Sequence, residues 1–164
     1  MEKGTDTLAA SLKDQWARTW DMWEAMIHSI PDDEWRKGDV DYLIPARHLI
    51  HVLHADDIFT GDTPFDQYDH FQWFEVREGE WETVPEELLS KEVALAALAG
   101  VRAVVEERLT KLDDAALLES EKVHPWTGQT RLSKLLYNLR HTQHHLGEVN
   151  AELIRRGIEG VGWK

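Results

Sequence analysis

The chain has 164 residues, with 31 Asp and Glu against 18 Lys and Arg, nine His, eight Trp and no Cys. The lack of Cys excludes disulfides, thiolate zinc sites, iron–sulfur clusters and a Cys nucleophile, so that any metal must be held by His, Asp or Glu. The net charge of −13 argues against a nucleic-acid partner and against binding to an anionic membrane surface.

The length predicts a single domain over residues 1–164 with a sizeable core. The first residues show no basic segment followed by an apolar stretch, so no export signal is expected. No run of apolar residues is long enough to span a bilayer. A cytoplasmic location is therefore expected.

Four stretches repeat apolar residues every three or four positions, which is the pattern of an amphipathic helix. The predicted helices cover residues 6–30, 45–59, 85–112 and 132–156. Pro45 suits the first turn of the second helix, and Gly157 suits the end of the last. No stretch alternates apolar and polar residues long enough to predict a sheet. The fold class is therefore expected to be all-α, and four long helices favour a four-helix bundle.

Five of the eight tryptophans form two groups. Trp16, Trp20 and Trp23 keep helical spacing and are predicted to pack in the core. Trp126 and Trp163 lie outside the predicted helices. They are expected to cap the core, with a place at the mouth of a pocket as the alternative.

Residues 60–84 link the second and third predicted helices, and this link is far longer than most helix–helix connections. It carries six aromatic residues, which argue against disorder: Phe65, Tyr68, Phe71, Trp73, Phe74 and Trp81. Two interpretations remain open, a structural flap over the bundle and a lid over a site. The surrounding segment 56–92 holds twelve acidic and two basic residues. It is expected to be solvated and to keep the protein soluble, with an effect on substrate choice as the alternative.

Six of the nine histidines form two clusters on the second and fourth predicted helices: His48, His51 and His54, and His141, His144 and His145. His141 and His145 lie one turn apart on the same side of their helix, whereas His144 points outward. His48 and His51 share a face, so either can join that pair. Three such imidazoles would hold a first-row metal and leave a coordination position open, which indicates catalysis or ligand exchange. The alternative is a set of separate histidines at the edge of the core or on the surface.

Two segments resemble the DinB/YfiT-like superfamily. Residues 135–157 (LLYNLRHTQHHLGEVNAELIRRG) are similar to its last helix, in which two His four residues apart precede Gly and then Gln or Glu. Residues 45–56 (PARHLIHVLHAD) look like its other motif, a His followed five residues later by an acid. Alignment of that acid with Asp56 selects His51, although His48 remains a rival ligand.

The resemblance implies an up-up-down-down four-helix bundle with a long loop between helices 2 and 3. It implies that His51, His141 and His145 hold a divalent metal, commonly nickel or zinc, in proteins that are often homodimers. Glu148 lies within about 20° of His141 around the helix. It is predicted to be catalytic, as a proton acceptor or as an acid behind the metal ligands, with a solvated helix-face glutamate as the alternative.

The resemblance implies a kind of chemistry, because the characterised members of this superfamily are mostly transferases that use mycothiol or bacillithiol, together with related isomerases. A divalent metal lowers the pKa of a thiol or of water, and a thiol must come from outside this Cys-free chain. We therefore expect a transferase or a hydrolase acting on a small molecule, with a low-molecular-weight thiol as a candidate cosubstrate. The alternative is a non-enzymatic metal-binding or stress-response protein of the same fold. A di-iron centre is disfavoured, because no helical Glu-x-x-His pair fits.

Overall fold

The computed structural model describes residues 7–68 and 83–164. Its helices are α1 (Leu8–Ser29), α2 (Pro45–Thr60), α3 (Lys91–Thr110), the short α4 (Asp114–Leu117) and α5 (Arg131–Arg155). The described residues form no strand, and a single isolated bridge pairs Ser120 with Thr130. The predicted all-α class is confirmed for this part of the chain. None of its helices combines the length and the apolar character that a membrane crossing requires.

Capping residues explain where the helices begin and end. Thr7, Ser90 and Thr130 precede α1, α3 and α5, and each side-chain oxygen accepts a hydrogen bond from a backbone N–H three residues further on. Pro45 occupies the first turn of α2, and Gly157 follows α5 with a positive φ of 76°. The third predicted helix starts too early at residue 85, because Ser90 provides the cap.

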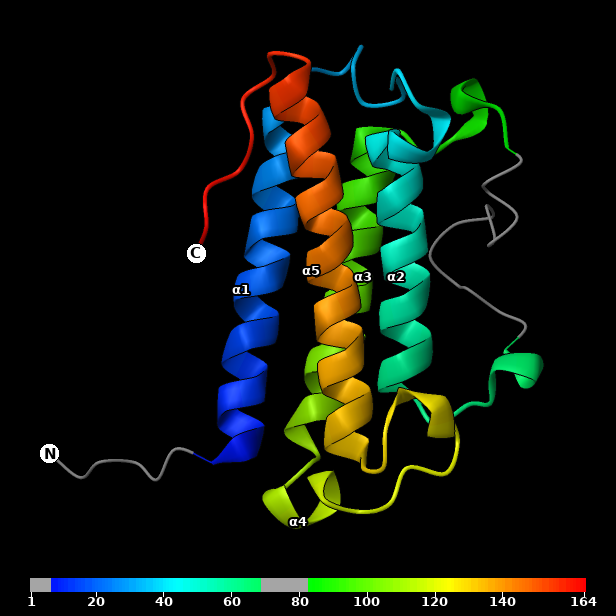
Figure 1. Cartoon of the computed structure of the whole chain (residues 1–164), viewed down its shortest axis with the longest axis vertical. Helices are drawn as coiled ribbons and strands as arrows, with labels where there is room; N and C mark the ends of the chain where they lie inside the picture. Colours follow the sequence, from blue (N-terminus) through cyan, green and yellow to red (C-terminus); the bar gives the residue numbers. More distant parts are fainter. Residues whose placement is uncertain (1–6, 69–82) are drawn as a thin grey trace, which may run out of the picture.

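The helix directions differ from the prediction. In Figure 1, α1 runs upward, α2 and α3 both run downward, and α5 returns upward. The order is up, down, down, up, so the predicted up-up-down-down order is wrong. Residues 30–44 join α1 to α2 at one end, whereas α2 finishes at the end opposite to the start of α3. The link 61–90 is long enough for this return, since an extended chain covers about 3.3 Å per residue against about 1.5 Å in a helix.

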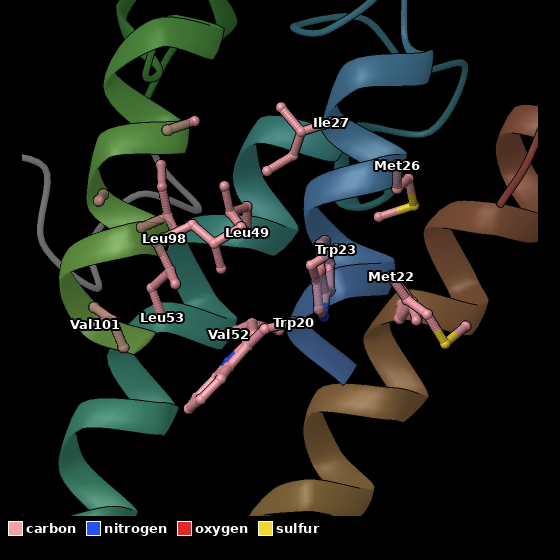
Figure 2. Close-up of a cluster of buried hydrophobic side chains, with 14 of the residues drawn as sticks. Trp20, Met22, Trp23, Met26, Ile27, Leu49, Val52, Leu53, Leu98 and Val101 are labelled. Atoms are coloured by element: carbon pink, nitrogen blue, oxygen red, sulfur yellow. The ribbon is translucent and has the colours of Figure 1, made fainter. Parts of the chain in front are cut away.

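Each long helix packs on two others. Both α1 and α2 contact α3 and α5, so the core lies between these four helices. Figure 2 shows part of it, in which side chains of α1 such as Trp23 lie with those of α2 and α3 such as Leu49 and Leu98. Trp16, Trp20 and Trp23 are fully buried, which confirms their predicted place in the core.

Trp126 and Trp163 do not cap the core. Trp126 is 60% exposed and Trp163 is 83% exposed. Trp126 lies in a 3-10 turn whose buried side chain is that of Thr127, and Trp163 lies in the tail after α5. The expectation that both cap the core is therefore wrong.

The long link can be judged only in part. Phe65 is half exposed, and the Tyr68 hydroxyl donates a hydrogen bond to Asp57 Oδ2 at 2.6 Å. The other aromatic residues of the link lie outside the described residues: Phe71, Trp73, Phe74 and Trp81. The flap and the lid both stay predictions.

Candidate metal centre

Helices α2 and α5 bring three histidines together. The Nε2 atom of His141 lies 3.1 Å from His51 Nε2 and 3.1 Å from His145 Nε2. The three rings offer nitrogen atoms that all lie within 4.8 Å of one another. Nitrogen ligands about 2.0 Å from a metal lie about 3.3 Å apart at a tetrahedral angle, so these separations suit one ion. The structure therefore places the three predicted ligands around one point, and their binding of a metal stays a prediction.

A cation satisfies these nitrogens better than hydrogen bonds between the rings do. A nitrogen of a neutral imidazole either donates or accepts a hydrogen bond. His141 Nε2 has two close neighbours, so its single proton or single lone pair cannot serve both equally. A cation instead accepts the lone pairs of all three rings. Three imidazoles are a donor set that first-row divalent metals take, with at least one position left open.

The protonation of the histidines favours this role. Burial, followed by the proximity of the other rings, lowers the pKa of His141 to about 3 and that of His145 to about 4. Burial also lowers the pKa of His51. Imidazole binds metals in its neutral form, so all three side chains are ready to bind at neutral pH without losing a proton.

Glu148 lies behind His145. Its Oε2 atom is 2.8 Å from His145 Nδ1, and it also accepts a hydrogen bond from the Tyr42 hydroxyl at 3.4 Å. A carboxylate in this position keeps the proton on Nδ1 and leaves the Nε2 lone pair for a metal. The geometry thus favours Glu148 as a positioning residue, and its predicted catalytic role is not tested. His144 is exposed, as predicted, with Nε2 3.4 Å from Glu148 Oε1.

His48 does not take the place of His51. Its Nδ1 atom lies 3.1 Å from Nδ1 of His145, on the edge of that ring opposite to His141. His48, His145 and Glu148 form a second group whose donor atoms also lie within 4.8 Å of one another. His54 is buried and belongs to neither group among the described residues.

A buried carboxylate fixes the position of α2 against α5. Asp56 is fully buried and accepts hydrogen bonds from α1 and α5: Trp20 Nε1 at 3.1 Å, Asn138 Nδ2 at 3.1 Å and Thr142 Oγ1 at 2.7 Å. Thr142 is the residue after His141, so the network holds the ligands of the two helices in register. Burial raises the pKa of Asp56 to about 7. The expectation that the acidic segment is solvated is wrong at this residue.

Sequence reasoning missed the two α5 members of this network. It used Asp56 to align a motif and counted it in a solvated acidic segment, and did not connect it with Asn138 or Thr142. Asn138 and Thr142 lie four residues apart on the same side of α5, and both are fully buried. Two polar residues at that spacing beside an apolar stripe indicate that their side chains are buried and need a hydrogen-bond acceptor on another helix.

Helices packed around three converging histidines define a helical protein with a candidate metal centre. A model of the DinB superfamily matches residues 15–149, which include His51, His141 and His145. The chain therefore belongs to the DinB superfamily, and the resemblance carried by the two histidine motifs is confirmed. Comparisons with curated proteins and with solved structures give no match.

Proposed function

We propose that this chain is a single-domain, four-helix-bundle enzyme that uses a divalent metal to activate an external thiol or water molecule. The observation that carries the proposal is the convergence of His51, His141 and His145 through nitrogens about 3.1 Å apart. Held by three neutral imidazoles, a nickel or zinc ion keeps its full positive charge and lowers the pKa of a thiol or water molecule that binds it.

The residues of the chain prepare and maintain this site. Glu148 holds the His145 ring in the tautomer that presents Nε2, and its charge strengthens His145 as a ligand. The Asp56 network keeps α2 and α5 in register, so that the ligands from two helices meet without a large rearrangement. His51 and His141 are only partly buried, which supports access of a small substrate to the site.

Thiol transfer is the first candidate reaction. The chain has no Cys, so a sulfur nucleophile has to be a separate molecule. The resemblance to transferases that use mycothiol or bacillithiol favours this version. Hydrolysis needs no cosubstrate and is the second candidate, because the same donor set serves water.

The proposal is tested with protein purified without an affinity tag and loaded with nickel or zinc. Conjugation of an electrophilic small molecule is assayed with mycothiol, bacillithiol and glutathione, and ester hydrolysis is assayed without any thiol. Activity should require the metal, disappear in His51→Ala, and persist in His28→Ala, which removes an exposed histidine of α1. Loaded protein without activity in any assay contradicts the enzyme and favours a non-enzymatic metal-binding protein.

A further inference from the structure

The His145 ring faces a different set of donors on each edge. Its Nε2 atom lies 3.1 Å from His141 Nε2 in the first group. Its Nδ1 atom lies 3.1 Å from His48 Nδ1 and 2.8 Å from Glu148 Oε2. We propose that His48, His145 and Glu148 form a second metal site, in which the His145 ring bridges two divalent ions. This inference rests on the proposed function, because the two sites share His145.

The second donor set has the composition and spacing of a metal site. Two imidazoles and one glutamate are the ligands of several catalytic zinc centres. Ligands about 2.0 to 2.1 Å from a metal lie about 2.9 Å apart at a right angle and about 3.3 Å apart at a tetrahedral angle. The separations of 2.8 and 3.1 Å from His145 Nδ1 are close to this range. Small side-chain rotations would bring all three donors onto one ion.

The second site offsets part of the charge that a second ion adds. For His145 to bridge two ions, its Nδ1–H bond breaks, a bond from Nδ1 to the ion forms, and the proton passes to solvent. The bridging ring and the Glu148 carboxylate then each carry one negative charge. Because the two ions share the charge of the ring, these groups offset only part of the positive charge that the second ion adds, and the cost of placing it beside the fully buried His48 is lowered but not removed.

The two sites should fill in order. With one ion on the Nε2 side, His145 Nδ1–H still donates to Glu148. A second ion has to displace that proton and break this hydrogen bond, so it binds more weakly than the first. Tyr42 contacts two of the second-site residues: it is 43% exposed, its ring meets His48 edge to face at 4.8 Å, and its hydroxyl contacts Glu148.

The test is a titration of metal-free, full-length protein with Zn²⁺, followed by calorimetry. The wild-type chain should bind two ions in two separate steps. Binding of the second ion should release the His145 Nδ1 proton, and Glu148→Gln, which binds only the first ion, should not release it. His48→Ala and Glu148→Gln should each bind one ion, and His145→Ala should bind none. His51→Ala should keep one weakly bound ion. Circular dichroism of each variant checks that the helices are intact.

His28→Ala is the matched control for a surface histidine, and it should bind two ions like the wild-type chain. One ion in the wild-type chain, lost in His51→Ala, overturns the second site and leaves the first intact. One ion that survives in His51→Ala and is lost in His48→Ala overturns the first site and the bridging role of His145, because that ion then lies between His48, His145 and Glu148 alone. A second ion that persists in His48→Ala and Glu148→Gln is an adventitious ion only, and also overturns the second site.

Discussion

The buried carboxylate of Asp56 should make the stability of the protein depend on pH. Burial raises its pKa from 3.8 to about 7, so the folded state holds the proton more tightly than the unfolded state does. This contribution to stability is complete below pH 3.8 and is lost as the pH rises through 7. Asp56→Asn has no proton to lose at this position, so it should not show this loss.

The size of the effect follows from the two pKa values. Between pH 5 and pH 8, the free energy of unfolding of the wild-type chain should fall by about 2.5 kcal/mol relative to that of Asp56→Asn. At every pH, Asp56→Asn should also have an unfolding free energy lower by about 1 to 3 kcal/mol, because its amide N–H group faces the Trp20 N–H and two donors cannot pair. The buried histidines are the same in both proteins, so their contribution cancels in the difference.

The assay is urea unfolding of both metal-free proteins, followed by circular dichroism at pH 5, 6, 7 and 8. The expected result is a difference in unfolding free energy that shrinks as the pH rises. A difference that stays constant over this range would refute the reasoning. It would mean that the three hydrogen-bond donors outweigh burial and keep Asp56 ionised at pH 5.

Three further predictions concern the histidines and tryptophans. His145→Ala should contain no metal in elemental analysis and should still melt cooperatively. If the metal were structural, the variant would instead lose several kcal/mol of unfolding free energy. Because burial lowers the pKa of His141 to about 3 and of His54 to about 4, metal-free protein should lose stability as the pH falls below 6.5, as measured by urea unfolding. Trp20→Phe should lower the free energy of unfolding by about 1 kcal/mol more than Trp16→Phe does in the same assay. Only the Trp20 indole donates to the buried carboxylate, and Trp16 Nε1 has no partner among the described residues.

The sequence predicted the helices and the candidate ligands because both depend on local spacing. Apolar residues three or four apart define each long helix, and His141 and His145 share a face on geometry alone. The meeting of His51 with this pair needed the family resemblance, because spacing within one helix says nothing about its partner helix. His48 is a rival of His51 in the sequence, but in the structure His48 lies beside Nδ1 of His145, whereas His51 lies beside Nε2 of His141.

The parts that the sequence did not predict depend on tertiary structure. The directions of α2 and α5 differ from the prediction, because the chain passes from one end of the long helices to the other between α2 and α3 and not between α1 and α2. Neither connecting segment has a periodic pattern that would indicate this. The burial of Asp56 depends on donors from two other helices, so its position in an acidic segment was misleading. The exposure of Trp126 depends on the orientation of one 3-10 turn, which composition does not specify.

The most direct test of the metal centre is an anomalous difference map from crystals of the protein loaded with nickel or zinc. The account predicts a peak on the Nε2 side of His145, about 2.0 to 2.2 Å from ring nitrogens of His51 and His141. A structure in which the His51 ring points away from His141, or a map without a peak between these three rings, would contradict it.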